Sequence, residues 1–207
     1  MRYRHIIWDF DGTLFDTYPV MARAFHDSLT EAGYEAGYQE VYDAMKIAIS
    51  DTVRKFQGRF GFGQDFLDGY RARRVQAELD FARPFDGITE VLDRVIAAGG
   101  DHFICTHRGD SIHELLRRAG VYGYFKEITT SAYGFARKPS PEAVQYLLDK
   151  YGLDPRETLM IGDRPLDVQA GQNAGTAGCF FDPDGAVYPP AQHQITDIRQ
   201  LFDVIGC

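Results

Sequence analysis

The sequence predicts an α/β protein, with a three-layer core built on a parallel sheet and an α-helical domain inserted after the first strand. Three observations carry this prediction. Short apolar runs alternate with segments of helical periodicity, and several of these runs end at glycine or at a polar residue. The alternation stops between residues 16 and 84, where only helical patterns occur. Strands that alternate with helices of this length form βαβ units, whose strands are parallel.

The predicted strands are short and rich in β-branched and aromatic residues. The first is Ile6-Ile7-Trp8, a buried run that breaks into a loop at Gly12. The others, in chain order, are predicted at residues 101–106, 127–131, 158–161 and 179–181.

The helices between these strands are predicted from apolar stripes and capping residues. Ser140 and Pro141 favour a helix start, as N-cap and first helical residue. Gly120 and Gly175 are each expected to end a helix. The most regular stripe, closed by Gly99-Gly100, consists of Ile88, Val91, Leu92, Val95 and Ile96.

Residues 16–85 are predicted to form a separate helical domain, because this segment contains no convincing strand. Its helical stripes include Val20/Ala24/Ser28 and Val41/Met45/Ile49. The core domain is then made of residues 1–15 and 86–207.

Composition excludes several classes of function. The chain has 207 residues and a formal net charge of −8, and it contains no Lys/Arg-rich stretch, so we expect no nucleic-acid partner. No run approaches the ~20 apolar residues that span a bilayer, so we expect no membrane association.

The widely spaced Cys105, Cys179 and Cys207 predict free thiols in a reducing compartment, the first two as core residues. The cytoplasm is the expected location.

Polar residues follow the predicted strands at the points where each strand ends. Asp9 and Asp11 follow the first strand, Thr106 follows the second, and Asp163 follows the fourth. Ligands of open α/β sheets bind beyond the carboxyl ends of the strands, so these residues predict one site. Lys138 precedes Pro139 on the loop that leads to the next helix.

These residues resemble, in order and spacing, the four motifs of the haloacid dehalogenase-like hydrolase superfamily. The first motif is similar to Asp9-Phe10-Asp11-Gly12-Thr13-Leu14-Phe15-Asp16-Thr17. The others are similar to Thr106, to Lys138-Pro139 and to Gly162-Asp163-Arg164-Pro165-Leu166-Asp167. The resemblance covers essentially the whole chain. It implies a Rossmann-like core with an inserted helical cap, and the chemistry of phosphate transfer.

The acidic residues have distinct expected roles. Asp9 is the expected nucleophile, since a carboxylate can attack phosphorus and form an acyl phosphate. Asp11 is the expected general acid and base. Mg²⁺ suits hard oxygen ligands beside a phosphate, and the resemblance implies ligands from Asp9, the Asp11 backbone carbonyl and Asp163. Asp167 is assigned to the same metal site, where it orients the ligands, or it is an acid that complements the helix dipole.

The remaining candidates are hydroxyl and basic residues. Thr106 is expected to contact a phosphate oxygen, and Lys138 to supply charge to the transition state. His107 is a further candidate for phosphate binding. Arg54, in the helical domain, offers a cation to an anionic leaving group. Two other arginines, Arg108 and Arg164, either reach the substrate or hold local loops and carboxylates.

The predicted function is hydrolysis of a small phosphorylated metabolite by a phosphatase related to phosphoglycolate phosphatase. The first alternative is a sugar phosphomutase resembling β-phosphoglucomutase, although such relatives often carry a bulkier apolar residue at the position of Thr13. A second alternative is a catalytically silent regulator on the same fold. The physiological substrate and the oligomeric state are not apparent from the sequence.

Overall fold

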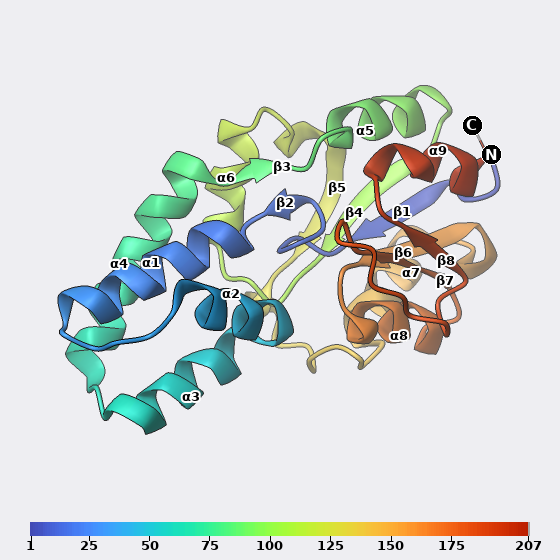
Figure 1. Cartoon of the computed structure of the whole chain (residues 1–207). Helices are drawn as coiled ribbons and strands as arrows, with labels where there is room; N and C mark the ends of the chain where they lie inside the picture. The colour runs from blue at the N-terminus through green and yellow to red at the C-terminus, as the bar shows by residue number, and fades with distance from the viewer. Residues whose placement is uncertain (207) are drawn as a thin grey trace. The chain divides into compact units, whose positions relative to one another are not determined.

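The computed structural model describes residues 1–206, so the expectation of a free thiol at Cys207 lies outside the described residues. The chain forms two compact units (Figure 1). One consists of Met1–Phe15 and the chain from Pro84 onward, and the other of Asp16–Arg83. The smaller unit therefore ends at Arg83, two residues before the predicted boundary at residue 85.

The larger unit is built on a six-stranded parallel sheet. Its α/β class, with a parallel sheet and helices on both faces, confirms the predicted fold. All five predicted strands are present, and the short sixth one was not predicted. In spatial order the strands are β5 (Phe125–Thr129), β4 (Asp101–Cys105), β1 (His5–Trp8), β6 (Thr158–Gly162), β7 (Ala177–Phe181) and β8 (His193–Ile195).

The central position of β1 brings three strand ends to the same level. Trp8 is in register with Ile104 of β4 on one side and with Ile161 of β6 on the other. The backbone N–H of Asp9 then donates to the Ile161 carbonyl at 2.9 Å. The residues that follow β1, β4 and β6 therefore meet at one edge of the sheet.

Helices cover both faces of this sheet (Figure 1). Ile7, Phe103 and Met160 point to one face, where they pack in one apolar cluster with residues of two helices. The opposite face is covered by a helix that buries four residues of the predicted stripe, Ile88, Val91, Leu92 and Val95. The fifth, Ile96, is 45% exposed, so its prediction as part of the apolar stripe was wrong. Gly99, which follows the helix, has φ +78°. The helices of this unit are α5 (Ile88–Ala97), α6 (Ser111–Arg118), α7 (Glu142–Tyr151), α8 (Pro165–Asn173) and α9 (Leu201–Ile205), with α7 and α8 on the first face and α5 on the second.

The buried thiols of Cys105 and Cys179 pack in the core, as predicted. Burial raises the pKa of Cys179 to about 12, so this thiol is inert at neutral pH. No helix within the described residues is long and apolar enough to cross a membrane.

A histidine, His102, is fully buried on β4. Its Nδ1 accepts a hydrogen bond from the Trp8 indole at 3.0 Å, and its Nε2 lies 3.2 Å from the Leu92 carbonyl oxygen of α5. Burial lowers the pKa of this imidazole from 6.5 to about 4. His102 is therefore a neutral core residue at physiological pH.

This histidine should weaken the fold in acid. Between about pH 6.5 and 4 the unfolded chain binds a proton at His102 and the folded chain does not, so the free energy of unfolding falls as the pH drops. His102 changes the free energy of unfolding by at most about 1.4 kcal/mol per pH unit. His102→Asn keeps an acceptor for Trp8 and should lose less stability between about pH 7 and about pH 5 in urea titrations. An equal loss in both proteins would remove His102 as the cause.

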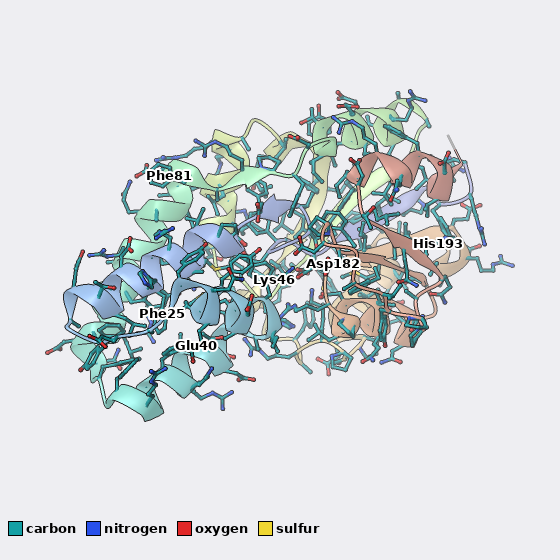
Figure 2. All side chains as sticks on the ribbon, viewed as in Figure 1. Phe25, Glu40, Lys46, Phe81, Asp182 and His193 are labelled. Atoms are coloured by element: carbon teal, nitrogen blue, oxygen red, sulfur yellow. The ribbon has the colours of Figure 1, made fainter. Side chains whose placement is uncertain are left out.

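The smaller unit is helical, with an aromatic core. Phe25, labelled in Figure 2, makes edge-to-face contacts with Phe56 and Tyr70 at ring-centroid distances of 5.7 and 4.8 Å. The predicted stripe Val41/Met45/Ile49 does not belong to one helix, because the backbone is extended at Ala48. The helices are α1 (Tyr18–Glu31), α2 (Tyr38–Ile47), α3 (Ile49–Phe60) and α4 (Gln64–Phe81). At the two points where the chain passes from one unit to the other, it forms the short strands β2 (Phe15–Asp16) and β3 (Arg83–Pro84), which pair with each other.

Candidate active site

A buried lysine joins two of the sequence motifs. Lys138 Nζ lies 2.5 Å from Asp9 Oδ1 and 2.5 Å from Asp167 Oδ1, and it donates to the Cys105 carbonyl at 3.0 Å. All three charged side chains are at most 2% exposed. One ammonium group thus bridges the loop after β1 and the first turn of α8.

Close backbone approach places Asp167 at this point. A Cβ atom on Gly162, the last residue of β6, would lie 2.2 Å from the Asp167 Cβ, so only glycine fits here. Asp167 Oδ2 accepts the Arg164 backbone N–H at 3.1 Å, which satisfies a donor at the start of α8. Asp167 therefore caps its helix with one oxygen and binds Lys138 with the other.

A carboxylate oxygen is left over at the centre of the site. Asp9 Oδ2 is buried and has no hydrogen-bond partner among the described residues. Oxygen atoms of Asp9, Asp163 and Asp167 all lie within 4.8 Å of one another, and Thr13 Oγ1 donates to Asp163 Oδ1 at 3.2 Å. Three carboxylates beside one ammonium offer the hard oxygen donors that Mg²⁺ prefers. These residues therefore fit a divalent cation.

Burial and neighbouring charges set the pKa values of the buried ion cluster. Burial raises the pKa of Asp9 to about 6, against the lowering effect of Lys138 and with a further rise from Asp167. Burial alone would lower the pKa of Lys138, but the Asp167 and Asp9 carboxylates outweigh it and hold that pKa above its usual value. Lys138 is therefore a permanent cation within this cluster.

The carboxylate of Asp11 is held by an arginine. Arg108 places Nη2 3.0 Å from Asp11 Oδ1 and donates from Nε to Asp11 Oδ2 at 3.3 Å. The guanidinium also lies over the Phe10 ring, 5.2 Å from its centroid. The sequence predicts that Arg108 either reaches the substrate or holds a local loop or carboxylate. In the structure it binds the Asp11 carboxylate.

The loop after β4 carries Thr106 and His107. Thr106 Oγ1 accepts the Arg108 backbone N–H at 3.2 Å. His107 Nε2 accepts the Lys138 backbone N–H at 2.8 Å. Burial, followed by the cations Lys138 and Arg137, lowers the pKa of His107 to about 4, so the neutral ring can accept this bond.

The family model for haloacid dehalogenase-like hydrolases matches residues 6–180, most of the chain. The chain belongs to this family. The solved structure of a hydrolase from Streptococcus pneumoniae TIGR4 is similar over 100% of both chains, with a TM-score of 0.73 and 33% identity.

Two curated relatives are similar to this haloacid dehalogenase-like hydrolase over most of their length. The pyrophosphatase PpaX of Oceanobacillus iheyensis is 26% identical, over 100% of this chain and 98% of its own. The phosphoglycolate phosphatase of Aquifex aeolicus is 27% identical, over 84% of this chain and 82% of its own. This hydrolase is an enzyme of the phosphohydrolase class.

One predicted site residue of this hydrolase lies in the helical unit. Arg54, on α3, is exposed and pairs with Asp51 of the same helix. Its role with an anionic leaving group stays a prediction.

Other contacts of the site were missed at the sequence level. The Thr13 hydroxyl on Asp163 and the Cys105 carbonyl on Lys138 are examples. The hydroxyl residue Thr13, two positions after Asp11 in the first motif, was the available signal, whereas a backbone carbonyl leaves no signal in a sequence.

Proposed function

We propose that this hydrolase is a Mg²⁺-dependent phosphatase that removes phosphate from a small phosphorylated metabolite through an aspartyl-phosphate on Asp9. The observation that carries the proposal is the buried Asp9 Oδ2, which lacks a hydrogen-bond partner among the described residues while Lys138 holds Oδ1. A buried acceptor without a partner is costly in a structural role. A nucleophile needs such an available oxygen.

The chemistry proceeds in two displacements. Asp9 Oδ2 attacks phosphorus, the bond to the leaving oxygen breaks, and Asp11 delivers a proton to that oxygen. A water molecule then gives its proton to Asp11 and attacks phosphorus, which releases inorganic phosphate and restores the Asp9 carboxylate.

Positive charge must oppose the charge that develops on the phosphoryl oxygens. Lys138 supplies a fixed ammonium at Asp9, and Thr106 is the proposed hydroxyl donor to a phosphate oxygen. Asp9, Asp163 and Asp167, with the Asp11 carbonyl, would hold Mg²⁺, which supplies charge beside the phosphoryl group when bound.

The names of the relatives, which specify pyrophosphate, phosphoglycolate and N-acetylmuramic acid 6-phosphate, support a proposal for the substrate class. We propose a phosphorylated metabolite of this size, and a ranking of such compounds by kcat/KM would identify it. Turnover that needs a bisphosphate primer would instead indicate the mutase. The cytoplasmic location stays a prediction.

Metal removal should abolish turnover. With p-nitrophenyl phosphate as substrate, EDTA is expected to lower kcat by about 100-fold or more, and excess Mg²⁺ to restore it. The measurement is the release of p-nitrophenol by dialysed protein with and without Mg²⁺. Turnover that is indifferent to EDTA would contradict the proposed cofactor, and no turnover in either condition would favour the silent regulator.

Substrate selection is assigned to the helical unit, through Arg54. The proposed partner of Arg54 is an anionic group of the substrate outside its phosphate, and p-nitrophenyl phosphate has no such group. Arg54→Ala should therefore raise KM for the best metabolite by about 10-fold and hardly affect p-nitrophenyl phosphate. The matched control is Arg71→Ala, which removes a similarly exposed arginine paired with Asp68 on α4. Equal KM changes for both substrates would show that Arg54 does not select the leaving group.

A further inference from the structure

Two consecutive side chains after β4 contact two different parts of the active site. His107 accepts the backbone N–H of Lys138, which is 31 residues away in the chain. Arg108 binds both carboxylate oxygens of Asp11, which is 97 residues away. Neither contact involves the nucleophile itself, so both side chains act on the groups that flank Asp9.

The segment around Lys138 needs such an anchor. It lies between the short helix η2 (Ser131–Tyr133) and α7, where residues 134–141 form neither helix nor strand. The ammonium of Lys138 meets two carboxylates at 2.5 Å each, and the position of its backbone limits the side-chain conformations that reach both. The 2.8 Å bond to His107 fixes the backbone at the lysine itself.

The orientation of Asp11 depends on Arg108 in a comparable way. Two contacts to one carboxylate set the plane of the carboxyl group as well as its position. Arg108 is itself fixed, because its N–H donates to Thr106 Oγ1 at 3.2 Å and its carbonyl accepts the Ser131 N–H at 2.9 Å. The guanidinium lies over the Phe10 ring, and the side chain is almost fully buried.

We propose that His107 and Arg108 form a positioning clamp that sets Lys138 and Asp11 relative to Asp9. Neither clamp residue touches the phosphoryl group in this role: His107 acts through Lys138 and Arg108 through Asp11. The proposal rests on the proposed function, in which Lys138 stabilises the phosphoryl charge and Asp11 protonates the leaving oxygen. Loss of Arg108 should therefore change how the rate depends on the leaving group, whereas loss of His107 should lower the rate equally for all substrates.

The role of Arg108 is tested with a series of substrates that differ in their leaving groups. Arg108→Met should lower kcat/KM by about 100-fold for alkyl phosphates, whose poor leaving oxygen needs a proton, and by about 10-fold or less for p-nitrophenyl phosphate. Arg108→Lys retains one charged donor and should recover part of the loss. The control is Arg156→Met, which removes a surface arginine bound to Asp154 and should leave both rates unchanged.

The role of His107 is tested with the same substrates. His107→Leu should lower kcat by about 10- to 100-fold for all of them equally, with little change in KM, because Lys138 acts on the phosphoryl group. His107→Gln places an acceptor near the position of Nε2 and should recover most of the loss. Amide hydrogen exchange should accelerate at Lys138 in the leucine variant. The control is His193→Leu. His193, which is labelled in Figure 2, is half-buried, and its Nε2 is hydrogen-bonded to the Tyr3 hydroxyl.

Two results would overturn the clamp while leaving the proposed function standing. One is an equal loss for alkyl and aryl phosphates in Arg108→Met, and the other is an unchanged kcat in folded His107→Leu protein. Thermal melts of each variant separate a loss of folded protein from a loss of rate. A wild-type protein without Mg²⁺-dependent turnover would instead overturn the proposed function, and the clamp with it.

Discussion

Asp9→Asn protein is expected to lose turnover by about 10⁴-fold or more while it folds normally, because the amide is nearly isosteric but a far poorer nucleophile. In the absence of metal its melting temperature should equal or exceed that of the wild type. The reason is that burial raises the pKa of Asp9 to about 6, so the charged form is costly in the folded chain near neutral pH, and the amide removes this cost.

Three measurements check this result. Steady-state assays give the rate, and thermal melts with and without Mg²⁺ give the stability; Mg²⁺ should raise the melting temperature of the variant less than that of the wild type. Acid-quenched protein should retain radiolabelled phosphate from p-nitrophenyl phosphate only when Asp9 is present. Normal turnover by folded Asp9→Asn protein would remove Asp9 from its proposed role.

Lys138→Met is expected to lower both activity and stability. It leaves the carboxylates of Asp9 and Asp167 buried without their shared cation, and breaking a buried ion pair in this way costs about 3–5 kcal/mol. The deficit in the free energy of unfolding should shrink as the pH falls. Burial already raises the pKa of Asp9 to about 6 against the lowering effect of Lys138, and loss of the ammonium removes that lowering effect, so protonation of Asp9 favours the folded chain in acid.

Urea titrations at about pH 7 and about pH 5 measure this deficit. The control is Lys126→Met, which removes a half-exposed ammonium paired with Asp101 and should cost about 1 kcal/mol or less. A Lys138→Met protein as stable as this control at neutral pH would show that the carboxylates do not depend on Lys138.

The central cluster was predictable because the topology of a parallel sheet determines it. Asp9 and Asp163 follow adjacent strands, and the carboxyl ends of adjacent parallel strands lie at one edge. Asp167 lies in the first turn of α8, which begins two residues after Asp163. Lys138 was identified by its motif, and the structure places it against Asp9.

The contacts of the surrounding loops were not predictable in the same way. The partners of His107 and Arg108 depend on side-chain directions in irregular backbone, which no periodicity describes. Strand β8 has three residues, too few for an alternating pattern to stand out. The end of α2 was missed because Val41, Met45 and Ile49 keep helical spacing in sequence across the break at Ala48.

The order of the strands also bears on biosynthesis. The strand that leads to the nucleophile is translated before both strands with which it pairs, which begin at Asp101 and at Thr158. Both partners are translated much later, so this strand must wait for most of the chain before its backbone is paired on both sides. A nascent polypeptide cut short before Thr158 would leave one edge of that strand open to pairing with other chains.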